Sequence, residues 1–150
     1  MKQKLNDAFW LFFPIVVGGI IGFLTSNFMD YQTLIQPPLA PPSIVFPIAW
    51  SILYLLIGIA YFLFRKKSKD STTIFIYYLQ LFFNYLWTII FFVLKQRFFS
   101  VLWIITLLLL IVINIFQFYR YHKLSAYLMI PYFLWVLFAT YLNIGIYLLN

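Results

Sequence analysis

The stretch Phe98–Tyr119 reads FFSVLWIITLLLLIVINIFQFY, and it decides the fold class. It contains no charged residue, and a helix of about 20 apolar residues can cross the roughly 30 Å hydrocarbon core of a bilayer. Four more uncharged stretches of this kind occur, at Ala8–Phe28, Phe46–Phe64, Ile74–Leu94 and Ser125–Leu149. Strands of a membrane β-barrel would be about 10 residues long and would alternate apolar with polar residues. The sequence therefore predicts an all-α integral membrane protein, a bundle of five transmembrane helices.

The composition of the whole chain excludes other classes of protein. Of its 150 residues, 65% are hydrophobic and 9% are charged, whereas a soluble globular domain has roughly 25% charged residues. Such a chain cannot cover a water-exposed surface, which excludes a soluble enzyme, a disordered chain and a nucleic-acid-binding domain. The absence of cysteine excludes disulfides and thiolate metal sites. We expect a single five-helix transmembrane domain over residues 1–150, with no metal and no required cofactor.

The basic residues between the spans predict the orientation in the membrane. Five spans place the chain ends on opposite sides. One side carries eight of the 10 basic residues, namely Lys2, Lys4, Arg65, Lys66, Lys67, Lys69, Arg120 and Lys123. The other side carries Lys95 and Arg97. Under the positive-inside rule, the N-terminus is cytoplasmic and the C-terminus is outside, in a bacterial plasma membrane. The proline-rich loop Met29–Ile44 then lies outside, and the basic turns contact lipid headgroups.

Polar side chains within the spans predict a site inside the bundle. Helical spacing puts Gln80 and Asn84 on one face of the third span, and Trp135 and Asn143 on one face of the fifth. At about 1.5 Å rise per residue, Asn84 and Trp135 lie near mid-membrane, below the proline-rich loop. A cavity lined by rings and amides there would be a ligand pocket with the loop as its lid. Hydrogen bonding between neighbouring helices is the alternative explanation of the same residues.

Three ordered blocks of sequence carry a family resemblance. VFPIAWSILY occupies Val45–Tyr54 after two prolines, QLFFNYLW occupies Gln80–Trp87, and PYFLWVLFATYLN occupies Pro131–Asn143. Together they resemble the PP…VF-x-P-x-W-x-x-LY, QL-x-x-N-x-x-W and PY-x-x-W-x-x-FA-x-x-LN blocks of the translocator protein family. This family is also called the tryptophan-rich sensory proteins or peripheral-type benzodiazepine receptors. The resemblance runs from the first loop to the C-terminus and implies a bacterial member.

The resemblance implies a membrane receptor or carrier that binds porphyrins such as protoporphyrin IX, and isoquinoline carboxamide or benzodiazepine-type ligands. The ligand contacts that it implies are Trp50, Tyr54, Asn84, Trp87, Trp135, Ala139 and Asn143. The lid residues that it implies are Tyr31, Gln32 and Pro42. Because no cation lines this pocket, we expect porphyrin carboxylates to point toward the lid and water. The basic residue of the animal cholesterol motif is missing after Tyr147.

The resemblance also implies that the bundle is often a homodimer. A GxxxG pattern at Gly18–Gly22 would let another helix approach closely. That helix belongs either to the same chain or to a second subunit, and the pattern does not distinguish the two.

Two other functions stay open at the level of sequence. Some bacterial members of the family are credited with light-dependent breakdown of protoporphyrin, for which Trp50 and Trp135 would be the electron donors. No conventional catalytic set is present, because His122 is the single histidine and no carboxylate pair lies in a span. The third hypothesis is a stress-linked regulator that acts through a partner protein.

Overall fold

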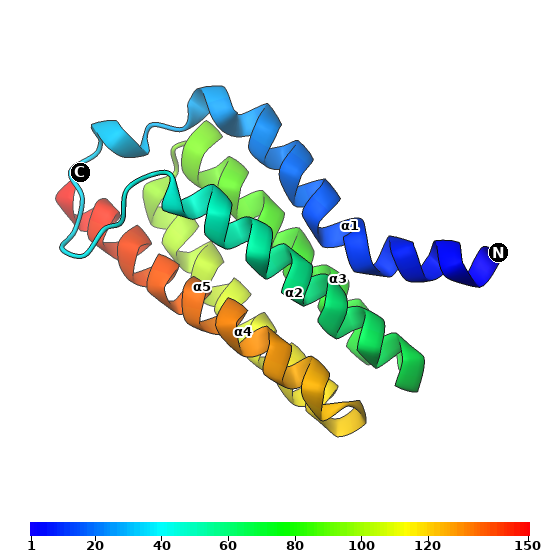
Figure 1. Cartoon of the computed structure of the whole chain (residues 1–150). Helices are drawn as coiled ribbons and strands as arrows, with labels where there is room; N and C mark the ends of the chain where they lie inside the picture. The colour runs from blue at the N-terminus through cyan, green and yellow to red at the C-terminus, as the bar shows by residue number, and fades with distance from the viewer.

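The computed structural model describes residues 1–150 as five long helices joined by turns and one long loop (Figure 1). The helices are α1 (Lys2–Thr25), α2 (Val45–Lys67), α3 (Ser71–Thr88), α4 (Arg97–Tyr121) and α5 (Lys123–Leu149). Each is long and apolar enough to cross a membrane. The predicted fold class, an all-α bundle with five spans, is confirmed. The helices run beyond the uncharged stretches into the neighbouring basic residues, since lysine and arginine are good helix formers.

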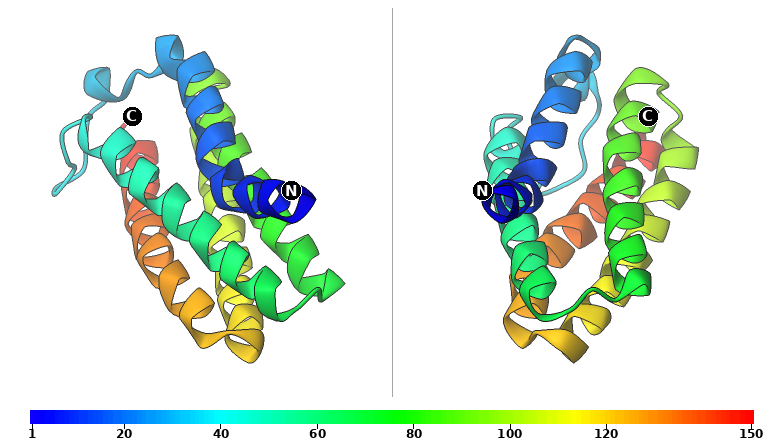
Figure 2. Two further views of the ribbon diagram at one scale, coloured as in Figure 1. Left: turned by 45° about the vertical axis from the view of Figure 1, so that its right-hand side comes forward. Right: turned by 90° about the vertical axis from the view of Figure 1, so that its right-hand side faces the viewer.

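The five helices form a closed ring around one interior (Figure 2). Around this ring, α1 packs on α2, α2 on α5, α5 on α4, α4 on α3, and α3 on α1. Large apolar side chains point away from the ring, and Phe75, Leu109 and Phe116 are each at least 60% exposed. An apolar outer surface with all backbone bonds satisfied inside helices is what a bilayer requires. The chain is therefore an integral membrane protein.

An aromatic core fills the ring at its basic end, where α2 finishes and α3 begins. The rings of Tyr61 and Tyr77 stack with 3.9 Å between centroids, and the rings of Phe64 and Phe118 stack at 5.0 Å. All four side chains are buried to 2% exposure or less. Stacked rings of this kind hold three helices together by packing rather than by charge. The hydrogen-bonded polar residues Asn84 and Asn143 lie farther toward the opposite end, under the long loop.

Helix α1 bends at an internal proline. Pro14 has no backbone N–H, so the carbonyl of Trp10 lacks its normal helical partner. Figure 1 shows the N-terminal part of α1 running in a different direction from the rest of the helix, and Asp7 in this part pairs with Lys66 at the end of α2 at 2.6 Å. The hydroxyl of Tyr85 in α3 donates to the carbonyl oxygen of Pro14 at 3.0 Å and fixes α1 to the ring at this point. The second half of α1 therefore takes part in the site, whereas the first half does not.

The glycines separate two kinds of helix contact. At Gly58 of α2, an added Cβ would overlap the main-chain oxygen of Leu11, so α1 and α2 approach each other backbone to backbone. At Gly18 of α1, a Cβ would overlap the ring of Tyr54. At Gly22, nothing lies within 4 Å of that position. In the GxxxG pattern, Gly18 thus takes part in packing inside the bundle, whereas no other part of the chain packs against the Cβ position of Gly22.

The turn between α3 and α4 is wider than an ordinary helix end. The N–H of Leu94 donates to the oxygen of Ile89 at 2.9 Å, an i→i+5 bond, over the segment Ile89–Val93. Lys95 then takes a positive φ of 53°. Wide helical turns of this kind often occur at functional sites. Here the turn brings α4 to begin at Arg97, beside the long loop.

Candidate ligand-binding site

Asn84 is the centre of a buried polar network between α2, α3 and α5. The hydroxyl of Tyr54 donates to its side-chain oxygen at 2.6 Å. Its amide nitrogen donates to the hydroxyl of Tyr132 at 2.9 Å, and that hydroxyl donates to Gln80 at 2.8 Å. None of these side chains is more than 8% exposed. All four side chains are neutral, so the network places polar groups inside the membrane without burying a charge.

Trp50 and Tyr54 form an aromatic wall above this network. Their rings stack with 5.3 Å between centroids and 28° between planes, and Trp50 also meets the ring of Tyr132 edge-on at 6.3 Å. The two residues lie one helical turn apart on α2, which is why their rings meet. Gly18 of α1 leaves the space that the ring of Tyr54 occupies. The wall therefore depends on a glycine of a neighbouring helix.

A second polar contact joins α3, α4 and α5 nearer to the loop. The indole N–H of Trp87 donates to the side-chain oxygen of Asn143 at 2.8 Å. The amide nitrogen of Asn143 donates to the hydroxyl of Ser100 at 3.0 Å. Asn143 and Ser100 are buried to 1% exposure or less. Both amides of the predicted site are thus hydrogen-bonded within the chain.

Trp135 lies at the seam between α2 and α5. Its ring meets that of Phe46 at 5.9 Å, and Ala139 follows one turn later with 6% exposure. Its indole nitrogen is buried and has no hydrogen-bond partner in the chain. An apolar groove of about 450 Å³ opens beside it, lined by Ala49, Ile52, Leu53, Pro131, Leu134, Trp135 and Phe138. The groove lies on the outer face of the bundle, where Ile52 and Leu134 are each 55% exposed, and the buried indole nitrogen of Trp135 does not open onto it.

The loop folds on itself through the predicted lid residues. The hydroxyl of Tyr31 donates to the carbonyl oxygen of Pro41 at 2.9 Å, and the amide of Gln32 donates to the hydroxyl of Ser43 at 2.8 Å. Together with Pro42 they line a shallow hollow of about 400 Å³ on the loop. The ring of Tyr31 points inward and is only 7% exposed. The loop is therefore held in one conformation by its own hydrogen bonds and forms a cap.

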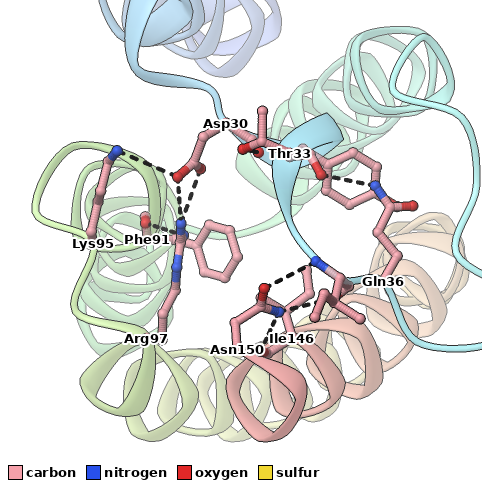
Figure 3. A network of polar contacts seen from close by, with 10 residues as sticks. Asp30, Thr33, Gln36, Phe91, Lys95, Arg97, Ile146 and Asn150 are labelled. Carbon is pink, nitrogen blue, oxygen red and sulfur yellow. Dashed lines mark hydrogen bonds and ion pairs between the residues drawn. The ribbon is translucent and has the colours of Figure 1, made fainter.

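Figure 3 shows polar contacts that hold the loop to the helix ends. Asp30 forms an ion pair with Arg97 at 2.8 Å and a longer one with Lys95 at 3.4 Å. The side chain of Asn150 accepts from the N–H of Ile35 and donates to its carbonyl oxygen, both at 2.9 Å. Asn150 thus pairs with the loop backbone as a neighbouring strand would. The loop is fixed to both α4 and α5.

Acid is expected to release the Asp30 contact only at unusually low pH. Partial burial acts to raise the pKa of Asp30, but the hydrogen bonds and charge of Arg97, with those of Lys95, outweigh it and hold the pKa below the ordinary value. Stabilisation from a lowered carboxyl pKa is present above the unfolded-state value, about 3.9, and is lost as the pH falls through the folded-state pKa. The loop should therefore stay closed between pH 7 and pH 5.

A spin label on the loop can measure this, because the chain contains no cysteine. Leu39 lies at the loop surface with 85% exposure, so Leu39→Cys gives one labelling site. Label mobility should rise only below about pH 3.9. In Asp30→Asn the label should be more mobile at neutral pH than in the unsubstituted loop, although Asn150 and Tyr141 still hold the loop to α5, and the acid transition should be absent. A transition between pH 5 and pH 7 in the unsubstituted loop would contradict this account of Asp30.

Comparison with known proteins places the chain in a family. The family model described as TspO/MBR matches residues 10–149. The chain belongs to the TspO/MBR family. It is 34% identical over 140 residues to a tryptophan-rich protein TspO of Archaeoglobus fulgidus, covering 91% of each chain. It is 32% identical to a protein of the same name from Chlorobaculum tepidum, covering 87% of this chain and 89% of that one. It is 29% identical to a translocator protein homolog of Schizosaccharomyces pombe, covering 91% and 87%.

The family resemblance identified from three sequence blocks is thus confirmed. The structure brings Trp50, Tyr54 and Asn84 together, and it brings Trp87 and Asn143 together as a second group. Trp135 and Ala139 border the first group from α5. The lid residues Tyr31, Gln32 and Pro42 lie in one hollow above both. The assignment of these residues as ligand contacts stays a prediction.

Sequence reasoning missed four residues that lie at the candidate site. Tyr132 and Ser100 supply hydroxyl partners to Asn84 and Asn143. Asp30 and Arg97 pair across 67 positions of sequence. The tyrosine lies in a recognised block, so its position one turn before Trp135 was the available signal. Nothing local in the sequence indicates the ion pair.

Proposed function

We propose that this protein is a membrane receptor or carrier for porphyrins, and that the same site accepts isoquinoline carboxamide or benzodiazepine-type molecules. The observation that carries the proposal is the neutral aromatic wall, in which Trp50 stacks on Tyr54 above the amide of Asn84. A flat apolar ring binds by stacking on such walls. Membership in the TspO/MBR family supports the same function.

The polar groups of the site favour a ligand that is largely apolar. The side-chain oxygen and nitrogen of Asn84 are both hydrogen-bonded within the chain, so Asn84 does not need a polar partner on the ligand. The indole N–H of Trp135 is buried without a partner in the chain, and a rotation of the side chain toward the groove would let it donate to one acceptor on the ligand. A charged group buried at this depth without a partner would cost several kcal/mol. A macrocycle with its polar groups at one edge meets these conditions.

We also propose that the bundle lies in the membrane with its long loop on the outer side. Eight of the 10 basic residues lie at the end of the bundle opposite the loop, and basic residues concentrate on the cytoplasmic side of bacterial plasma membranes. The loop then faces outward, so a ligand would enter from outside or from the outer leaflet.

Protoporphyrin IX should bind the purified protein saturably in the dark. Asn84→Ala removes the centre of the polar network, and Trp135→Ala removes a wall and the free donor. Each change should weaken binding by about tenfold: Trp135→Ala loses an aromatic contact worth about 1–1.5 kcal/mol, and Asn84→Ala releases the hydroxyl of Tyr54, so that the aromatic wall is no longer held in place. Quenching of tryptophan fluorescence during titration in detergent measures the dissociation constants.

Asn114→Ala is the matched control for Asn84→Ala. Asn114 is also a fully buried asparagine, but it lies on α4 and its amide has no partner in the chain. Its replacement should leave porphyrin affinity unchanged. Saturable binding that neither Asn84→Ala nor Trp135→Ala weakens would remove the ligand from this site. Illumination of the same complex then tests separately whether bound porphyrin is broken down.

A further inference from the structure

Arg97 is held rigidly at the loop end of the bundle. Its guanidinium lies over the ring of Phe91 at 4.2 Å and also donates to the carbonyl oxygen of Phe91. One of its nitrogens donates to both carboxylate oxygens of Asp30, at 3.0 and 2.8 Å. The side chain is only 14% exposed. A guanidinium fixed in this way is a preformed seat for a carboxylate.

The aromatic residues below Arg97 lead from this seat to the proposed porphyrin site. Phe91 stacks on Trp87 at 5.3 Å. It also packs in one buried cluster with Tyr31 and Ile146. The ring of Tyr31 meets Phe46 at 4.9 Å, and Phe46 meets Trp135 at 5.9 Å. Rings, together with the side chain of Ile146, therefore form one apolar layer from the guanidinium of Arg97 to Trp135.

Two adjacent loop residues, Asp30 and Tyr31, place a carboxylate and a ring at this layer. Tyr31 places a flat ring, 7% exposed, among the other rings. Asp30, the residue before it, places a carboxylate on Arg97 (Figure 3). A ring with a carboxylate at its edge is the chemical form of a porphyrin with propionate arms. The loop thus presents to the bundle the two groups that such a ligand carries.

We propose that Arg97 binds a carboxylate of the ligand. In the unliganded protein, Asp30 and Tyr31 occupy the positions that the carboxylate and the ring of the ligand would take. The inference rests on the proposed porphyrin-binding function and adds the residue that binds the carboxylate of the ligand. On binding, the ligand carboxylate replaces that of Asp30 on Arg97, and Asp30 moves into water. The guanidinium stays paired in both states, so the exchange avoids an unpaired buried cation.

The charges at this end of the bundle support Arg97 as the seat. Lys95 and Arg97 are the only basic residues on the loop side. Lys95 is 58% exposed and lies 3.4 Å from Asp30, so water screens much of its charge. Arg97 is four times less exposed and touches the ring layer through Phe91. It is therefore the cation that a ligand in the ring layer can reach.

Comparison of protoporphyrin IX with its dimethyl ester tests this inference. The ester keeps the ring and removes both negative charges. Binding is measured in the dark by tryptophan quenching in nanodiscs of neutral phosphatidylcholine, so that lipid charge does not contribute. The protein without substitutions should bind the acid about tenfold more tightly than the ester, since a charge-assisted hydrogen bond has that value.

Substitutions at the seat should change the acid-to-ester ratio in a defined way. Arg97→Gln should bring the ratio close to one, mainly by weakening the acid. Asp30→Asn should tighten binding of both ligands and keep the ratio, because the internal competitor is lost while Arg97 remains. Arg120→Gln makes the same change as Arg97→Gln at the opposite end of the bundle and should leave both affinities unchanged.

A purely structural role for the Arg97–Asp30 pair predicts a different result. Both substitutions would then weaken acid and ester by the same factor, and an unchanged ratio in Arg97→Gln overturns the inference. Loss of affinity in Asp30→Asn overturns it too, even if Arg97→Gln fails to fold. If the folded protein without substitutions binds neither ligand, the proposed porphyrin function itself fails.

Discussion

Replacing Asn84 by leucine should lower the free energy of unfolding by about 2 kcal/mol. The side chains are similar in size, so packing changes little. The hydroxyls of Tyr54 and Tyr132 each lose a partner while they stay buried, at 8% and 0% exposure. A buried polar group left without its partner costs more than the hydrogen bond contributes when both partners are present. Thermal unfolding in a mild detergent, followed by circular dichroism, measures the loss.

Removing the stranded hydroxyls should restore most of the stability. In the triple variant Asn84→Leu, Tyr54→Phe and Tyr132→Phe, only the oxygen of Gln80 loses its partner. Asn114→Leu is the control, because that buried amide has no partner in the chain to lose. It should not destabilise the protein. Equal losses in Asn84→Leu and Asn114→Leu would show that the network around Asn84 contributes nothing particular.

Replacing Gly58 by alanine should have the second large effect, a loss of about 3 kcal/mol. The new methyl group would overlap the main-chain oxygen of Leu11. A backbone oxygen cannot move aside as a flexible side chain can, so α1 must separate from α2. Close approach through small residues is a main source of helix association in membranes. Unfolding by sodium dodecyl sulfate, at a fixed ratio to mild detergent, measures the change.

Gly22→Ala gives the opposite expectation. Nothing lies within 4 Å of the new methyl group, and alanine favours a helix over glycine by up to about 1 kcal/mol. This variant should be as stable as the unsubstituted protein or slightly more stable. If Gly22→Ala destabilised the protein as much as Gly58→Ala, the contact between α1 and α2 would not lie at Gly58.

The sequence predicted the helices well because hydropathy is a local property. Uncharged stretches as long as a bilayer is thick specify spans without knowledge of their neighbours. The spacing of Gln80 and Asn84 also predicted correctly that they share one face. The closest helix contact was harder to find, since the visible pattern is Gly18–Gly22 and the backbone approach is at the isolated Gly58.

Partners from other helices could not be predicted for a different reason. With 24% aromatic residues, one tyrosine such as Tyr132 does not stand out as the partner of Asn84. The pairing of Asp30 with Arg97 joins segments 67 positions apart. It depends on the wide turn Ile89–Val93 and on the path of the loop, and both are products of tertiary packing. Long-range pairs of this kind carry no periodicity that a sequence pattern could reveal.

The membrane voltage acts differently on the two ends of the proposed site. No Asp, Glu, Lys, Arg or His lies in the middle of any helix, and Asp30 and Arg97 lie at the loop end. The voltage does about 2.3 kcal/mol of work per elementary charge per 100 mV, and only on charge that moves through the bilayer. A dicarboxylate seated at Arg97 has barely entered this field. Carrying it through the bundle would move two charges, about 4.6 kcal/mol per 100 mV. Binding at the seat is thus nearly independent of voltage, whereas net transport of the dianion is strongly coupled to it.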